Sequence, residues 1–182
     1  FTVVDNLTVN DLLAEAVFDR AGRDLESIGQ GWVELVAGDL SDWPISAEEA
    51  AQALRSVVRI LGAGRRFTYG DRQPADHMPK AVADYLAAVA RLHMVDANDL
   101  VDKVTAAVAA SRSAPSWLLD TSTLTSTLTV VTAEEASPRW VCPNCATIHL
   151  HPSAGVCMSR GCHHLGLEET AAQAAQPDYY GW

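Results

Sequence analysis

The sequence contains no run of 18 apolar residues, so it predicts no helix that spans a bilayer. Basic residues are also scarce, because 13 lysines and arginines stand against 23 acidic residues and leave a net charge of −10. A body this acidic repels a nucleic-acid backbone at long range, so a nucleic-acid contact would need a local basic patch. No basic and apolar leader is present, so we expect a cytoplasmic location. The first residue is Phe1 rather than methionine, and we interpret the chain as a piece of a longer polypeptide.

A complete phosphate-binding loop is missing as well. The segment Gly62-Ala-Gly64-Arg-Arg66 resembles half of such a loop, but no Gly-Lys-Ser/Thr follows it. Ser153 lies in His151-Pro-Ser-Ala-Gly155, which lacks the glycine spacing of a nucleophile elbow and favours a turn. The sequence therefore predicts that this chain alone hydrolyses no nucleotide.

Most of the first two-thirds of the chain has the 3.6-residue apolar period of amphipathic helices. The period predicts a helix near residues 11–26. Ser46-Ala-Glu-Glu49 is a capping box that opens a second helix, and Gly62 and Gly64 supply its stop. The segment around Trp32, between these two helices, has no pattern that we can assign.

Two more helices are predicted further along. Pro79 suits a helix start, and apolar residues recur at helical spacing over 82–93. Asp96-Ala-Asn98-Asp99 ends this helix and provides an N-cap for the next one, which runs through Val108. His93 lies on the apolar face of its helix, where a histidine is more often a core residue than a ligand.

The period changes after residues 111–116. Leucine and β-branched residues alternate over 124–131, which favours a strand with one face exposed to water. Seven of the nine residues over 121–129 are serine or threonine, so a low-complexity linker stays open as the alternative.

All four cysteines lie within residues 142–162, as Cys142-Pro-Asn-Cys145 and, after eleven residues, Cys157-Met-Ser-Arg-Gly-Cys162. Each pair can form a tight turn, and a short hairpin between the pairs can fold the second back on the first. Four thiolates at about 2.3 Å satisfy a tetrahedral Zn²⁺ and leave no position for water or substrate. The spacing therefore predicts a structural zinc ion, which would stabilise a segment too small to fold alone.

Four alternatives stay open at this stage. The cysteines could form two disulfides, or hold iron as in rubredoxin. His163 or His164 could replace Cys162 as the fourth ligand. His149 and His151 could hold a catalytic metal, although the sequence has no acid between Arg139 and Leu167 to assist them.

Together these patterns predict an α+β fold in which a helical domain precedes a small β zinc ribbon. We expect a mainly helical domain over 1–113 and a second domain over 114–182, which contains the strand and the ribbon.

Arginines concentrate in one stretch and give residues 55–72 a local positive charge. They are candidates for DNA phosphate contacts, with a second small patch near the cysteines. The alternative is a solvated face that pairs with the first 50 residues, where 11 acids stand against two arginines. The candidate residues are Arg55, Arg59, Arg65, Arg66 and Arg72, and then Arg139, Arg160, His163 and His164.

One stretch resembles a known family. The string Trp140-Val-Cys-Pro-Asn-Cys-Ala-Thr-Ile-His149-Leu-His-Pro-Ser-Ala-Gly-Val-Cys157 is similar to an insert between the two RecA-like motor halves of very large bacterial DEAD/DEAH-type superfamily 2 helicases. Several of those helicases belong to phage-defence and DNA-modification loci. The segments 1–9 and 178–182 look like the stretches that flank the insert. The gap between Cys157 and Cys162 is longer than the two residues expected there, which keeps His163 and His164 open as ligands.

The resemblance implies that Cys142, Cys145, Cys157 and Cys162 bind the metal and that the motor lies elsewhere in the parent chain. We therefore expect a non-catalytic accessory domain of an ATP-dependent DNA helicase, which braces the motor domains and contacts DNA. A protein-interaction module with structural zinc and no nucleic-acid binding is the alternative. A metal-dependent hydrolase built on His149 and His151 is a third.

Overall fold

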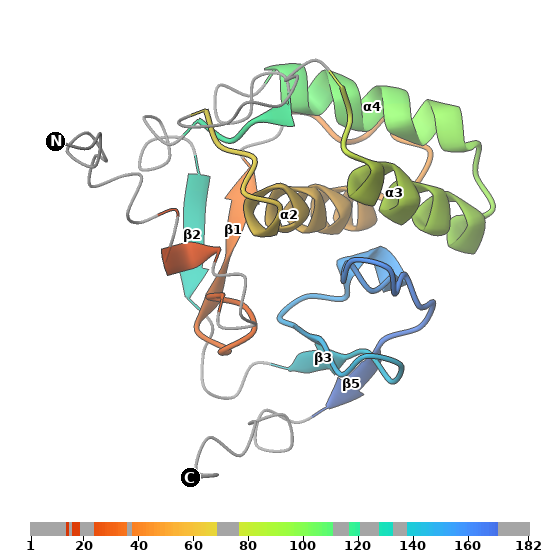
Figure 1. Ribbon diagram of the computed structural model, residues 1–182. Coiled ribbons are helices and arrows are strands. Elements are labelled where there is room, and N and C mark those ends of the chain that lie inside the picture. Colours follow the sequence, from red (N-terminus) through yellow and green to blue (C-terminus); the bar gives the residue numbers. More distant parts are fainter. Residues whose placement is uncertain are drawn as a thin grey trace, which may run out of the picture.

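The computed structural model has three α-helices and two small antiparallel sheets in the part of the chain that it describes (Figure 1). This composition agrees with the α+β class predicted from the sequence. None of the described helices combines the length and the apolar character needed to cross a bilayer. The described residues are 14, 16–18, 24–35, 38–68, 77–110, 117–120, 128–132 and 138–170.

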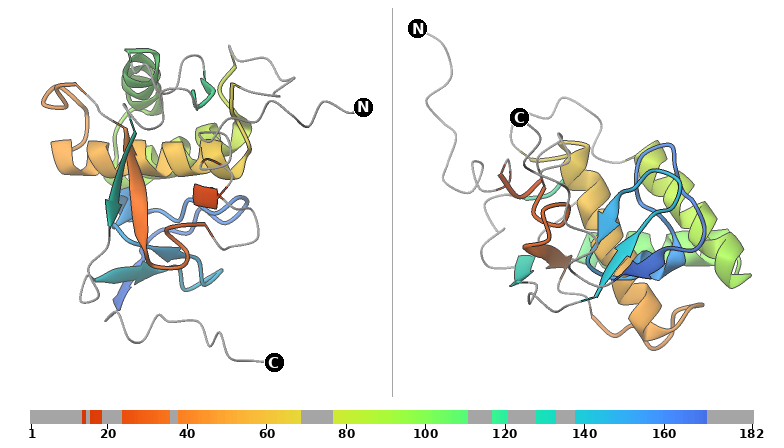
Figure 2. Two further views of the ribbon diagram at one scale, coloured as in Figure 1. Left: turned by 90° about the vertical axis from the view of Figure 1, so that its left-hand side faces the viewer. Right: turned by 90° about the horizontal axis from the view of Figure 1, so that it is seen from below.

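Helix α2 (Ala47–Ala63) lies between α4 on one side and the cysteine-bearing segment on the other (Figures 1 and 2). The predicted capping box is present, because Ser46 accepts from the Glu49 amide and the Glu49 carboxylate accepts from the Ser46 amide. The helix ends at Ala63 with Gly64 as its C-cap. The left-handed residue after this cap is Arg65, at φ 58°, so helicity does not extend to Arg66.

Gly62 has a packing role in addition to its place near the helix end. A Cβ atom at this position would lie 2.2 Å from the ring of Phe18. The missing side chain therefore lets the Phe18 ring contact the helix backbone, in the core that α2 shares with α3 and α4.

Helices α3 (Lys80–His93) and α4 (Ala97–Ala110) start where the sequence predicts. Pro79 is the N-cap of α3, and the Asp96 carboxylate accepts from the amides of Asn98 and Asp99 at the start of α4. Their apolar faces are buried in the common core through Val82, Tyr85, Leu86, Val89, Leu100, Val104 and Val108.

Strand β1 (Gly31–Leu35) is the segment that the sequence pattern left unassigned. It pairs with β2 (Leu128–Thr132), with Gly31 opposite Thr132 and Leu35 opposite Leu128. β2 confirms a strand in the predicted stretch, whereas residues 121–127 lie outside the described part. The helix predicted over 11–26 is wrong at its end, because residues 24–26 form turns.

The second sheet carries the cysteines and has the strand order β4–β3–β5. All its pairs are antiparallel, and the strands are β3 (Arg139–Val141), β4 (Ile148–His149) and β5 (Glu168–Thr170). A short 3₁₀ turn, η3 (Ser153–Gly155), follows β4 and packs against α2 and α3.

Contacts cross the predicted domain boundary at two places. β1 pairs with β2, and three residues from the cysteine-bearing segment (Ala154, Val156 and Met158) belong to the same hydrophobic core as the helices. The boundary itself lies within 111–116, outside the described residues, so the division into two domains stays a prediction.

Candidate metal centre

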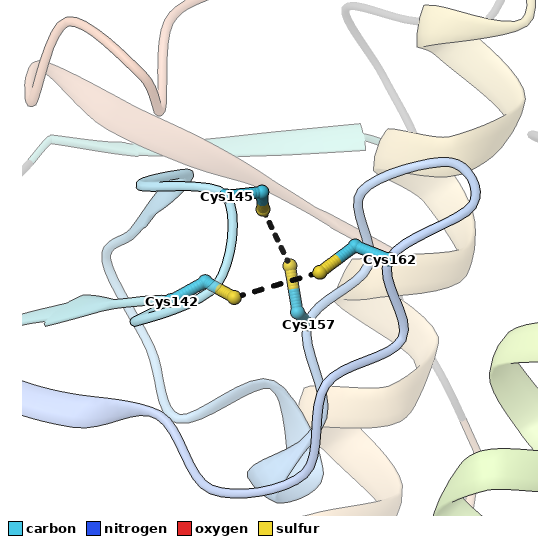
Figure 3. Close-up of side chains that lie close together, drawn as sticks. All are labelled: Cys142, Cys145, Cys157 and Cys162. Atoms are coloured by element: carbon cyan, nitrogen blue, oxygen red, sulfur yellow. Dashed lines mark hydrogen bonds between the residues drawn. The ribbon is translucent and has the colours of Figure 1, made fainter.

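The four cysteine sulfurs converge on one point (Figure 3). All of them lie within 4.8 Å of one another, and Cys142–Cys162 and Cys145–Cys157 are both separated by 3.6 Å between Sγ atoms. A disulfide bond is about 2.05 Å long, and all four residues are free cysteines, so neither disulfide of the alternative pairing is present. The structure confirms that the two cysteine pairs come together.

Two tight turns place these sulfurs. In the first, which joins β3 to β4, the Ala146 amide donates to the Cys142 carbonyl and Ala146 has φ 57°. In the second, the Cys162 amide donates to the Ser159 carbonyl, and Gly161 has φ 78°. The hydrogen bond from the Cys157 amide to the His164 carbonyl closes the second turn. Both pairs therefore approach each other from separate loops.

The donor set fits a tetrahedral metal ion. With metal–sulfur bonds of about 2.3 Å, the edges of a tetrahedron of sulfurs are about 3.8 Å long, close to the two 3.6 Å separations. Among the described residues, the group of metal-ligating side chains at this point consists of the four cysteines and includes neither His163 nor His164. Four sulfurs complete the coordination shell, so such an ion holds the fold together and has no position for a substrate.

Cys145 ionises more readily than Cys142 and Cys157. Burial opposes the ionisation, but hydrogen bonds with Thr147 outweigh it and lower the pKa of Cys145 to about 6. In contrast, burial raises the pKa of Cys157 and of Cys142. Because metal ligands are thiolates, ion binding releases protons from the buried members of the set.

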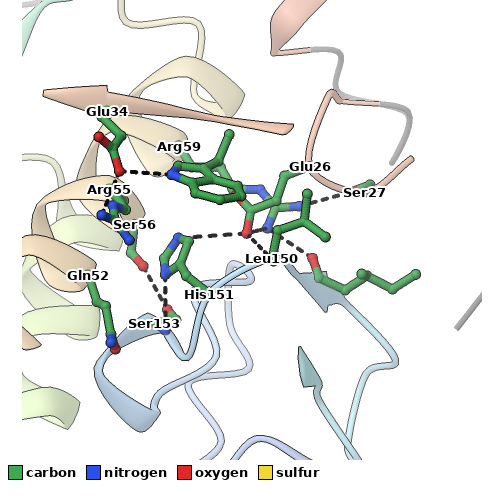
Figure 4. Close-up of polar contacts among 12 residues, drawn as sticks. Glu26, Ser27, Glu34, Gln52, Arg55, Ser56, Arg59, Leu150, His151 and Ser153 are labelled. Atoms are coloured by element: carbon green, nitrogen blue, oxygen red, sulfur yellow. Dashed lines mark hydrogen bonds and ion pairs between the residues drawn. The ribbon is translucent and has the colours of Figure 1, made fainter. Parts of the chain in front are cut away.

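The segment between the cysteine pairs contacts the helices in addition to joining the two cysteine turns. After β4 it leaves the sheet and docks against α2 and α3 (Figure 4). The Ser153 hydroxyl lies 2.7 Å from that of Ser56, and the Tyr85 hydroxyl donates to the Ser153 carbonyl at 2.9 Å. The Ala154 amide donates to the Gln52 side chain at 3.0 Å. We call residues 150–156 the docking loop.

His93 also contacts the docking loop. Its Nε2 lies 3.0 Å from the Ala154 carbonyl, and its Nδ1 lies 3.4 Å from a Glu49 carboxylate oxygen. The ring is about one-fifth exposed and joins α3 to the loop. It belongs to the packed part of the structure, as the sequence predicts.

His149 and His151 are buried rather than open to substrate. Burial lowers the pKa of His149 well below its usual value and that of His151 to about 3, so both rings are neutral at neutral pH. The His151 Nδ1 accepts from the Ser153 amide, whereas neither nitrogen of His149 has a partner among the described residues. The described residues bring no third ligand to these two rings.

The acid nearest to His151 comes from a distant part of the sequence. Glu26 Oε1 lies 3.7 Å from His151 Nε2 and accepts from the Leu150 amide at 3.0 Å. Burial raises the pKa of Glu26, although the Arg59 guanidinium opposes this effect. Sequence analysis missed Glu26 because no local pattern marks a carboxylate that folds against a loop more than a hundred positions away.

Arg59 is the centre of a buried ionic cluster. It pairs with Asp24 at 2.7 Å and with Glu26 at 3.0 Å, and it donates to the Ile148 carbonyl at 3.0 Å. Its side chain is only 7% exposed. This arginine therefore connects the turn before β1 with strand β4, and it is not a surface group for a phosphate.

The other candidate arginines differ in their partners and in their burial. Arg55 pairs with Glu34 at 2.5 Å and lies over the Trp32 ring. Arg66 is buried and donates to the Trp117 carbonyl. The pairing of Arg55 and Arg59 with acids of the first 50 residues agrees with the alternative interpretation, but for Arg59 the pair is buried rather than solvated. Arg72 lies outside the described residues.

Comparisons of this chain with protein-family models, with curated proteins and with solved structures find no match.

Proposed function

We propose that this chain is a non-catalytic accessory domain of a DNA helicase, in which a structural zinc ion holds the docking loop against a helical platform. The observation that carries the proposal is the closed set of four converging sulfurs. Such a set supplies rigidity and no reaction, which suits a domain that braces others.

The position of the docking loop supports a bracing role. The loop lies between Cys145 and Cys157, so an ion that joins these ligands also restrains the loop at both ends. Its polar contacts reach α2 and α3, and its apolar residues enter their core. Metal binding is therefore expected to stabilise the packing of the docking loop against α2 and α3.

The helicase part of the proposal is supported by the resemblance around Trp140 and the four cysteines. The missing lysine of a phosphate-binding loop is consistent with a motor located elsewhere in a longer polypeptide. The test is the full open reading frame, in which helicase motor motifs are expected on both sides of this segment. A frame without such motifs would contradict the helicase assignment and leave the metal site unaffected.

The metal site is tested by elemental analysis of the purified chain. One zinc ion per chain is expected, and Cys142→Ser and Cys162→Ser are each expected to lose most of it together with thermal stability. His164→Ala is the matched control, because this exposed ring lies beside Cys162 but outside the sulfur cluster. Stoichiometric iron in place of zinc would contradict the choice of metal, and full metal content in both serine variants would contradict the site.

A second candidate is a protein-interaction module that has structural zinc and no affinity for nucleic acid. It is favoured by the pairing of Arg55 and Arg59 with acidic side chains, because two of the candidate phosphate contacts already have carboxylate partners. The chain's net charge of −10 also favours a module without affinity for nucleic acid, because an acidic body repels the phosphate backbone. A measurement of DNA binding decides between the two candidates, because only the helicase accessory domain is expected to bind DNA.

A further inference from the structure

The four cysteines differ in their access to solvent. Cys142 and Cys157 are buried, at 1% and 0% exposure, whereas Cys145 is exposed and Cys162 is partly exposed. Each of the two tight turns therefore contributes one buried and one accessible sulfur to the cluster. A small oxidant in the solvent can reach the accessible sulfur of each turn while the protein stays folded.

Each accessible sulfur contacts a buried sulfur of the other turn. Cys145 Sγ lies 3.6 Å from Cys157 Sγ, and Cys162 Sγ lies 3.6 Å from Cys142 Sγ. Figure 3 marks both contacts as dashed lines between the two loops. Because the sulfurs of a disulfide are about 2.05 Å apart, small movements bring either pair to bonding distance. An accessible cysteine beside a second cysteine that can react with it is typical of redox-sensitive sites.

Polar groups lie beside both accessible sulfurs. The Thr147 hydroxyl is 3.1 Å from Cys145 Sγ, and the Asn144 side-chain amide donates to Cys162 Sγ at 3.2 Å. Both groups can donate to a thiolate, which is the form of cysteine that attacks an oxidant. The two accessible sulfurs are therefore the expected points of attack.

Contacts outside the sulfur cluster keep the two turns adjacent. Strand β3, which ends directly before Cys142, pairs with β5, which follows the second turn, and Val141 lies opposite Glu168. Val156, directly before Cys157, is fully buried and belongs to the core that contains the helices. Because none of these contacts involves a sulfur, they persist when a thiolate leaves the metal.

We propose that peroxide converts the metal site into two disulfides that join the turns, Cys145–Cys157 and Cys142–Cys162. The inference rests on the proposed structural zinc and deepens it, because it gives the site a regulated loss of its metal. The docking loop lies between Cys145 and Cys157, so the first disulfide closes the same two ends of the loop that the metal restrains. Oxidation therefore releases the metal while the docking loop keeps its place.

Each disulfide consumes one peroxide molecule. The accessible thiolate attacks a peroxide oxygen, so that a sulfur–oxygen bond forms, the oxygen–oxygen bond breaks and hydroxide leaves. The thiolate of the buried partner then attacks the resulting sulfenic sulfur, so that the disulfide forms, the sulfur–oxygen bond breaks and a second hydroxide leaves. Solvent protons convert both hydroxides to water. The two sulfurs together lose the two electrons that the peroxide gains, and each thiolate that reacts gives up its bond to the metal.

The test treats the zinc-loaded 182-residue chain with hydrogen peroxide and follows zinc release with a chelating dye. Release of about one zinc ion per chain is expected. Free thiols are then alkylated, and the unreduced tryptic peptides are analysed by tandem mass spectrometry. Trypsin leaves Cys142, Cys145 and Cys157 on the peptide 140–160 and Cys162 on the peptide 161–182.

The fragmentation pattern identifies the pairing. With the proposed disulfides, the two peptides stay joined, and backbone cleavage separates fragments between Cys142 and Cys145 but not between Cys145 and Cys157. Separation between Cys145 and Cys157 would show disulfides within each turn and would overturn the proposal. Zinc release with oxidation to sulfinic or sulfonic acids and no disulfide would overturn it as well.

Two histidine variants test the role of the accessible sulfur. Cys145→His and Cys142→His each leave three cysteines and supply an imidazole that can bind zinc. Cys145→His is expected to release zinc several-fold more slowly, whereas Cys142→His should still form the Cys145–Cys157 disulfide. Equally slow release from both variants would contradict the first attack at Cys145, and the pairing in the unsubstituted chain is tested without either variant.

Hydrogen exchange distinguishes the oxidised chain from a reduced chain stripped of metal by a chelator. The amides of Leu150 and Ala154 are expected to exchange nearly as slowly after oxidation as in the zinc-loaded chain, and faster in the stripped chain. Equal exchange in the oxidised and stripped chains would overturn retention of the docking loop. A chain purified without metal contradicts the proposed zinc site, whereas a chain that keeps its zinc in peroxide overturns this inference alone.

Discussion

The hydroxyl of Ser153 in the docking loop lies 2.7 Å from the hydroxyl of Ser56 in α2, although 97 positions separate them. Both side chains are fully buried. Ser153 belongs to the segment between the cysteine pairs, so this contact connects the candidate metal site with the helical core. It is one of several contacts that join the docking loop to the helices.

Removal of the metal is expected to release the docking loop before the helices unfold. The amides of Leu150 and Ala154 donate to Glu26 and Gln52. When the cysteines no longer restrain the loop, these two hydrogen bonds are expected to open more often. Hydrogen exchange with and without a chelator measures this, and both amides should exchange faster. Buried amides of α4 near Val104 serve as the internal reference; unchanged exchange in the loop would contradict the coupling.

The serine pair is expected to behave as a coupled unit. Ser56→Ala or Ser153→Ala alone should lower the free energy of unfolding by about 1–3 kcal/mol, because each leaves a buried hydroxyl without its partner. The double variant should cost less than the two single costs combined, because it leaves neither hydroxyl behind. Urea denaturation of the four proteins gives the coupling, and strict additivity would show that the contact contributes nothing.

Arg59 is expected to be a structural residue. Arg59→Met leaves Asp24 and Glu26 buried without their cation, and the expected loss is about 3–5 kcal/mol of unfolding free energy. Arg55→Met is the matched control, because Arg55 is about a quarter exposed and its pair with Glu34 should contribute no more than about 1 kcal/mol. Similar losses in the two variants would contradict the different roles that the structure assigns to them.

His151 is expected to make the fold sensitive to acid. Burial lowers the pKa of His151 from 6.5 to about 3, so below pH 6.5 the unfolded chain binds a proton that the folded chain does not. The contribution of this ring to stability is complete above pH 6.5 and is lost as the pH falls towards 3, at about 1.4 kcal/mol per pH unit.

His151→Asn tests this, because the asparagine oxygen can still accept from the Ser153 amide. Unfolding free energies of both proteins across this pH range should differ in slope by about 1.4 kcal/mol per pH unit. Comparison of the two proteins removes the effect of acid on the cysteine ligands, which is common to both. Parallel curves would mean that His151 titrates normally in the folded protein.

The predictable parts of this protein depend on residues close together in the chain. The capping box at Ser46, the cap at Asp96 and the start of α3 after Pro79 all follow from local hydrogen bonding and steric preference. The segment around Trp32 was not predictable, because a five-residue strand has no clear period until its partner is known. The end of the helix predicted over 11–26 was wrong for a related reason, since the turn at residues 24–26 follows the burial of Asp24 and Glu26 against Arg59.

The amino-acid sequence by itself determined the four cysteines as a candidate ligand set, because their spacing within 21 residues suffices to build two sulfur-bearing turns. Only the tertiary structure decided that the loop between these turns enters the helical core, and that Arg59 and Glu26 are buried beneath it. The physical reason is that burial and charge pairing depend on which distant segments meet. The bond between the Leu150 amide and Glu26 spans 124 positions, and no local pattern encodes it.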